Sequence, residues 1–169
     1  MEVAVRKLVV LVGVFAALTA CTSVGDVGRY KRYQVRSPAM EPTIPEGSTV
    51  TATKVKPGEY RPDAGDLVVF DPPDRPGWNP DGRPRILRVV AVPGDMIACC
   101  DPQGRITLNG TAQDEPYARV SEFDPPKAFE AITVPVDELF LLGDSRGMAN
   151  DSSFNGTVPL TTVIGVIKT

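Results

Sequence analysis

Short apolar runs separated by proline and glycine constrain the fold of this chain more than any other feature. The chain has 17 prolines and 15 glycines among 169 residues. Proline interrupts helices and central strands, so long helices are not expected. Leu67–Phe70 is a continuous apolar run, typical of a strand buried on both faces, and Ile86–Val92 is predicted to be a second buried strand. The sequence therefore predicts a mainly β fold of antiparallel sheets with long loops. Further strands are expected at residues 48–53, 96–100, 105–108, 132–134, 139–142 and 163–167, with a hairpin turn at Asn109-Gly110.

Composition excludes several classes of function. The chain has no histidine, which rules out Ser-His-Asp triads and the usual zinc sites. A net charge of -3 without a basic stripe gives no reason to expect a nucleic-acid partner. No pattern indicates a cofactor or a bound metal.

The first 21 residues have the pattern of an export signal. Arg6 and Lys7 precede the apolar run Leu8–Ala20, whose thirteen residues are fewer than the roughly 17–25 of a membrane-spanning helix. The run is followed by Cys21, and the sequence Leu-Thr-Ala-Cys resembles the cleavage box of bacterial lipoprotein precursors, in which the cysteine is lipidated. The alternative is an uncleaved apolar anchor in which Cys21 is incidental. Both interpretations place the folded part on the extracytoplasmic face of the cell membrane.

Residues 22–34 are expected to form a polar linker between this signal and a domain at residues 35–169. The linker holds the basic cluster Arg29, Lys31 and Arg32, which would lie near anionic lipid headgroups or simply in solvent. We consider the two alternatives equally good.

Five sequence blocks occur in one order along residues 35–167. They are Ser37-Pro38-Ala39-Met40-Glu41-Pro42-Thr43, Gly65–Phe70, Leu87–Asp95, Asn109-Gly110 with Asp114–Tyr117, and Gly143–Arg146 with Asp151-Ser152. In this order and spacing they resemble the conserved blocks of type I signal peptidases, in particular actinobacterial members. The resemblance implies the signal-peptidase fold and serine endopeptidase chemistry, in which a serine attacks the peptide and a neutral lysine acts as base.

The resemblance also implies that the catalytic positions have been replaced. The nucleophilic serine falls at Ala39, the lysine base at Leu87, and the serine that orients the lysine amine at Ala149. Arg88 cannot take over as base, because a guanidinium group stays protonated. We therefore expect no intact catalytic residues.

Other positions of the family pattern keep their polar groups. Ser37 matches the serine that helps to bind the oxyanion, and Ser37 and Met40 are candidates for an oxyanion and peptide groove. Asp144, Arg146 and Asp151 match residues that pair to support the site from behind, and we interpret them as a partly buried ion-pair network. The arginine that closes this network in the family is Ser153 here, which leaves that part of the network in doubt.

Cys99 and Cys100 resemble an adjacent pair found in actinobacterial members of the family. A disulfide between neighbours would be strained, since their Cα atoms lie about 3.8 Å apart across a trans peptide. The pair is either such a disulfide or two partly buried thiols.

These observations predict an exported, membrane-anchored pseudoenzyme that binds an extended peptide, a signal-peptide-like segment or an active signal peptidase. One alternative is an active signal-peptide-processing endopeptidase with Ser37 as a displaced nucleophile. Another is a structural envelope lipoprotein with a filled groove.

Overall fold

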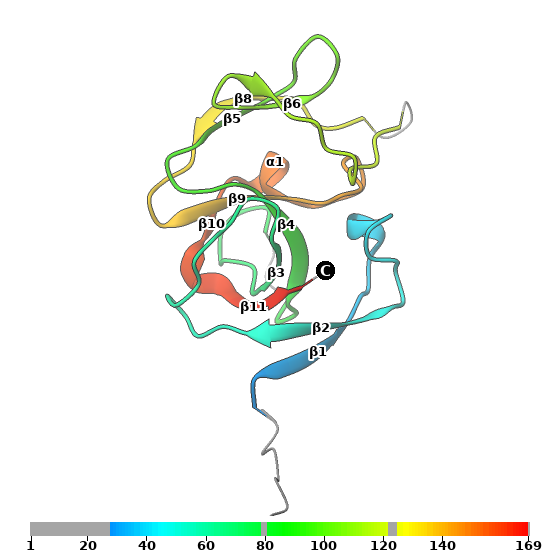
Figure 1. Cartoon of the computed structure of the whole chain (residues 1–169), viewed down its shortest axis with the longest axis vertical. Helices are drawn as coiled ribbons and strands as arrows, with labels where there is room; N and C mark the ends of the chain where they lie inside the picture. Colours follow the sequence, from blue (N-terminus) through cyan, green and yellow to red (C-terminus); the bar gives the residue numbers. More distant parts are fainter. Residues whose placement is uncertain (1–27, 79–80, 122–124, 169) are drawn as a thin grey trace, which may run out of the picture.

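The computed structural model describes residues 28–78, 81–121 and 125–168. Two antiparallel sheets make up this part of the chain (Figure 1). The larger has the strand order β1 (Tyr30–Gln34), β2 (Thr49–Lys54), β11 (Val163–Ile167), β3 (Leu67–Phe70), β4 (Arg85–Ala91), β9 (Glu138–Leu142) and β10 (Val158–Pro159). The smaller has the order β7 (Thr111–Ala112), β6 (Ile106–Leu108), β5 (Met96–Cys99) and β8 (Phe129–Thr133). The prediction of a mainly β fold is confirmed.

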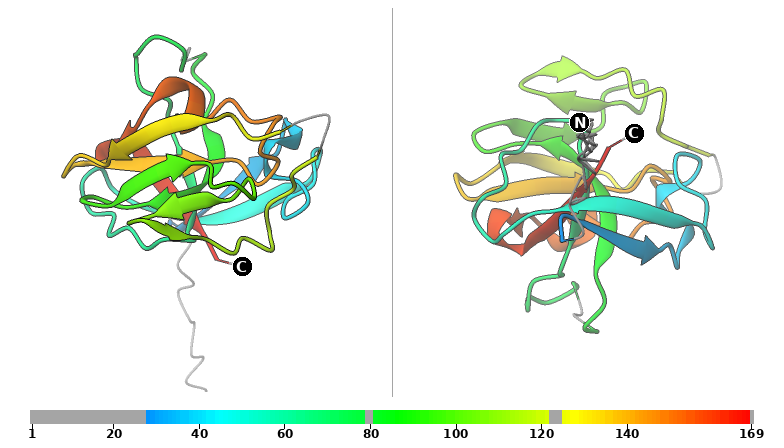
Figure 2. Two further views of the ribbon diagram at one scale, coloured as in Figure 1. Left: turned by 90° about the horizontal axis from the view of Figure 1, so that it is seen from above. Right: turned by 60° about the horizontal axis from the view of Figure 1, so that its bottom comes forward.

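Strands β4 and β9 contribute side chains to two apolar cores, which explains why most of their residues are apolar. Along β9, Leu139 and Leu141 pack into one core while Phe140 and Leu142 pack into the other. Successive side chains of a strand point to opposite faces, so a strand between two cores is apolar on both faces. The exception in β4 is Arg88, which is buried and charged. Figure 1 shows the smaller sheet above the larger, and in the left view of Figure 2, seen from above, the smaller sheet lies in front.

The first strand was not predicted from the sequence. Residues 30–34 were expected to belong to a polar linker, but Tyr30–Gln34 forms β1 and pairs along its whole length with β2. This strand is at the edge of the sheet and is largely exposed, so it lacks the apolar pattern by which buried strands are recognised. Two short strands, β7 and β10, and the single-turn helix α1 (Ser152–Asn155) were also not predicted.

The expected hairpin turn at Asn109-Gly110 joins β6 to β7. Both residues have positive φ, 52° and 80°, the backbone conformation that asparagine and glycine adopt most readily. The expected export signal, residues 1–21, and residues 22–27 of the expected linker lie outside the described residues. Within the described part of the chain, no helix is long and apolar enough to cross a membrane.

Candidate functional site: a groove between β1 and β4

A short 3₁₀ turn, η1 (Pro38–Met40), positions the segment that carries the expected nucleophile position. Pro38 fixes the first residue of the turn, and the Glu41 N–H donates to the Pro38 carbonyl at 3.0 Å. Met40 is 1% exposed and anchors the turn in the core. The turn therefore holds Ala39 in a fixed place next to strand β4 of the larger sheet.

The segment from Gly143 to Ala149 lies directly against this turn. The Ser145 N–H donates to the Ala39 carbonyl at 3.0 Å. A Cβ atom on Gly143 would lie 2.6 Å from the same carbonyl oxygen and would also collide with the Cβ of Ala149. Glycine at 143 thus allows the two alanines to lie close to one another.

Leu87 reaches the same region from β4. Its side chain is 2% exposed and belongs to the same apolar core as Met40 and Ala149, and Ala39 packs against this core. Ala39, Leu87, Ser37 and Met40 line one groove of about 640 Å³. The structure therefore brings the expected nucleophile and base positions to one groove, with a methyl group and an isobutyl group in them.

Ser37 lies two residues before Ala39 and is exposed at the start of the turn. Its side chain makes no capping hydrogen bond to the turn. Lys31 also lines the groove, and sequence reasoning missed it because β1 was taken for a linker. The Lys31 side chain is exposed, with its Nζ atom 5.0 Å from the centre of the Tyr33 ring. A lysine serves as a general base when burial disfavours its charged form, and this exposed position does not provide that environment.

Two buried ion pairs lie beside the groove, but each joins one residue of the expected network to a residue outside it. Asp144 is fully buried and accepts two hydrogen bonds from Arg88, from Nε at 2.8 Å and from Nη2 at 2.6 Å. Thr43 donates a further hydrogen bond to the same carboxylate. Arg88 also donates to the Gly65 carbonyl at 2.9 Å. Asp144 therefore joins the turn after η1 to strand β4.

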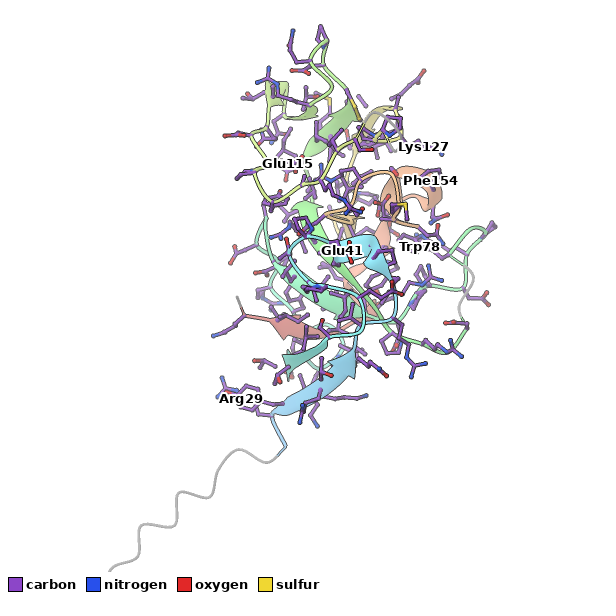
Figure 3. The ribbon with its side chains drawn as sticks, turned by 90° about the vertical axis from the view of Figure 1, so that its right-hand side faces the viewer. Arg29, Glu41, Trp78, Glu115, Lys127 and Phe154 are labelled. Carbon is purple, nitrogen blue, oxygen red and sulfur yellow. A yellow bond between two sulfur atoms is a disulfide. The ribbon has the colours of Figure 1, made fainter. Side chains whose placement is uncertain are left out.

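Arg146 pairs with Glu115 rather than with Asp144. Both terminal guanidinium nitrogens of Arg146 donate to the Glu115 carboxylate, and its Nε donates to the Gly143 carbonyl at 3.0 Å. Figure 3 shows Glu115 on the segment above the turn that carries Glu41. Glu115 belongs to the Asp114–Tyr117 block that the sequence singled out, but no role followed from the sequence alone. Arg88 and Glu115, which lie outside the expected set, are therefore the ion-pair partners of Asp144 and Arg146.

Tyr117 connects the two arginines. The guanidinium carbons of Arg88 and Arg146 lie 3.9 Å and 5.9 Å from the centre of its ring. Burial, followed by the charge of Glu115, raises the pKa of the Tyr117 hydroxyl to about 12. The ring therefore remains neutral and faces both cations.

The Asp151 carboxylate accepts hydrogen bonds from backbone N–H groups and a serine hydroxyl instead of from an arginine. One carboxylate oxygen accepts from the Gly143 N–H at 3.0 Å, and the other accepts from the Ser153 N–H and hydroxyl at 3.0 Å and 2.6 Å. Asp151 thus caps α1 and supports the strand end next to Ala149. Burial raises the pKa of its carboxyl group, and these hydrogen bonds oppose the rise. Ser153 provides polar contacts where the resemblance implied an arginine.

Cys99 and Cys100 form a disulfide at the end of β5, outside the groove. The peptide bond between them is cis, with the Cα atoms 3.0 Å apart, whereas the sequence argument assumed the trans spacing. The described residues include no group of three or more histidine, cysteine or acidic side chains suited to a metal ion.

Known proteins of one family are similar to this chain in sequence. The profile of the family described as "Signal peptidase, peptidase S26" matches residues 5–169. The probable signal peptidase I-1 of Synechocystis sp. is 31% identical over 135 residues, covering 78% of this chain and 65% of the relative. Signal peptidase I of Mycobacterium tuberculosis is 28% identical over an alignment of 184 residues, covering 79% and 62%. The chain therefore spans less than two thirds of the length of these relatives.

The crystal structure of a signal peptidase I from Enterococcus faecalis V583 has a similar fold. Its TM-score is 0.53 at 24% identity, and the match covers 64% of this chain and 98% of that chain. The structural likeness concerns the fold, and the family follows from the sequence match over residues 5–169. This chain belongs to the signal peptidase family, peptidase S26.

Proposed function

We propose that this protein is a catalytically inactive member of the family that binds an extended peptide at the extracytoplasmic face of a membrane. The observation that carries the proposal is the groove of about 640 Å³. It is present although Ala39 and Leu87 stand at the positions expected for the nucleophile and the base. Its ligand would be a signal-peptide-like segment or a segment of an active signal peptidase.

The chemistry of the groove argues against peptide hydrolysis. Ala39 has no atom that could attack a carbonyl, and Leu87 has none that could accept a proton. Among the described residues that line the groove, Lys31 is the only lysine, and it is exposed. A serine hydroxyl without a positioned base is a poor nucleophile, so Ser37 alone does not supply the activity.

The edges of two strands support peptide binding. In the larger sheet β1 pairs with β2 and lies at the edge, and the pairing of β4 with β9 begins only at Arg88. The segment Arg85–Leu87, paired with β3 on its other side, borders the groove. An extended peptide between these edges would gain main-chain hydrogen bonds by strand addition, a common mode of peptide recognition.

Titration of the purified full chain with a fluorescent signal-peptide segment tests binding. We expect saturable binding that a second, unlabelled copy of the segment displaces. Absence of binding up to millimolar peptide would instead favour a structural envelope protein. Labelling of Ser37 by a fluorophosphonate probe would favour the displaced-nucleophile peptidase.

The membrane anchor is proposed from the lipoprotein-like Leu-Thr-Ala-Cys sequence. We expect the Cys21→Ala variant to accumulate as a larger, unprocessed precursor without acyl label, because the cysteine is the site of lipidation in such precursors. Gel mobility and metabolic labelling with a fatty acid would measure this. Unchanged size and labelling would contradict cleavage and support an uncleaved anchor.

A further inference from the structure

Basic side chains surround the groove, although the chain as a whole is acidic. The described residues that line the groove include one carboxylate, Asp81, and five basic residues, which are Lys31, Arg32, Arg36, Arg83 and Arg85. The full sequence has 18 basic and 21 acidic residues. The charge of the groove is therefore opposite to that of the whole chain.

These basic residues lie on both sides of the groove. Lys31 and Arg32 belong to β1 and Arg36 follows it, whereas Arg83 and Arg85 come from the start of β4 and the segment before it. Asp81 lies 3.8 Å from Arg83, and both side chains are more than half exposed, so their mutual attraction is weak. Asp81 therefore offsets little of the positive charge around the groove.

The floor of the groove is apolar. Ala39, Met40, Ile86 and Leu87 line it between the two basic sides. An extended peptide with a small apolar centre would match this floor. Carboxylates on either side of that centre would match the basic residues along the groove.

We propose that the groove selects acidic extended peptides, with carboxylates flanking a small apolar centre. This inference rests on the peptide-binding function proposed above and specifies its ligand class. Clefts lined by one sign of charge concentrate ligands of the opposite sign, and salt weakens the effect because the charges are exposed.

Three synthetic peptides of equal length test the charge preference with the full chain in non-ionic detergent. Each has the centre Val-Ala-Val and flanks in which threonine alternates with glutamate, glutamine or lysine. We expect the glutamate peptide to bind about tenfold more tightly than its glutamine isostere, since a few exposed ion pairs together give an effect of this size. The lysine peptide should bind more weakly than both, and added salt should reduce the differences.

Two charge-matched variants locate the effect. Arg32→Gln with Arg36→Gln removes two charges from the groove, and Lys56→Gln with Arg61→Gln removes two exposed charges elsewhere. All four side chains are exposed, so both variants are expected to fold. The groove variant should lose about tenfold in affinity for the glutamate peptide and little for the glutamine peptide. The control should lose neither.

The outcomes separate the two proposals. Equal binding of all three peptides would overturn the acidic preference and leave peptide binding intact. Failure of every peptide to bind would overturn both. If vesicles containing phosphatidylglycerol compete for the groove and the glutamate peptide has no advantage over the glutamine peptide, the basic groove recognises lipid headgroups and the peptide class is wrong.

Discussion

Replacing Asp144 with alanine is expected to lower the free energy of unfolding by about 3–5 kcal/mol, the usual cost of leaving one partner of a buried ion pair alone. Arg88 is 8% exposed and directs two nitrogens at Asp144, so the variant would bury a guanidinium without its counterion. Thr43 would lose its acceptor as well. Urea denaturation followed by tryptophan fluorescence measures the loss, because Trp78 is fully buried.

An exposed ion pair provides the matched control for this experiment. Lys56 and Glu59 lie 3.5 Å apart with both side chains mostly exposed, so Glu59→Ala should cost less than about 1 kcal/mol. In a double-mutant cycle, Arg88→Met combined with Asp144→Asn should cost less than the sum of the single changes. A loss below about 1 kcal/mol for Asp144→Ala would contradict the role given to this pair.

Restoring the three replaced side chains together should produce weak cleavage of a signal-peptide substrate. Ala39→Ser, Leu87→Lys and Ala149→Ser would return a hydroxyl, an amine and an orienting hydroxyl to one region. The burial of Leu87, at 2% exposure, is the environment that disfavours a charged lysine. The rate is expected to stay low, because misplacement of catalytic groups by about 1 Å can cost a hundredfold in rate.

The single changes are the controls for the restored variant. Ala39→Ser alone should give no cleavage, since the hydroxyl would have no base. Leu87→Lys alone should destabilise the domain, since truncation of a buried leucine costs roughly 2–5 kcal/mol and the lysine stem recovers only part of that. Cleavage by Ala39→Ser alone, equal to that of the triple variant, would show that a base other than residue 87 acts in this groove.

The buried strands were predictable from the sequence, and the edge strand was not. Leu67–Phe70 is buried throughout and most of Arg85–Ala91 is buried, so the apolar composition of both strands reveals them. Tyr30–Gln34 is held by main-chain pairing to β2, which leaves no apolar pattern in its own sequence. The basic side of the groove that β1 forms was missed for the same reason.

The two replaced catalytic positions that line the groove were predictable from the order of the blocks, whereas the ion pairs beside the groove were not. Ala39 and Leu87 each stand in a block that fixes their alignment. The partners of Arg146 and Asp144 depend on how three distant segments pack, and Glu115 enters the network through its place beside Arg146. Such pairings depend on tertiary structure and leave no local signal.

Catalytic inactivity is tested most directly by mass spectrometry of a signal-peptide substrate after long incubation with the wild-type full chain. We expect the protein to retain the substrate, and the substrate to be recovered intact, with no more product than a mock purification gives. Product above that background, lost in the Ser37→Ala variant, would contradict catalytic inactivity and identify Ser37 as the nucleophile of an active peptidase.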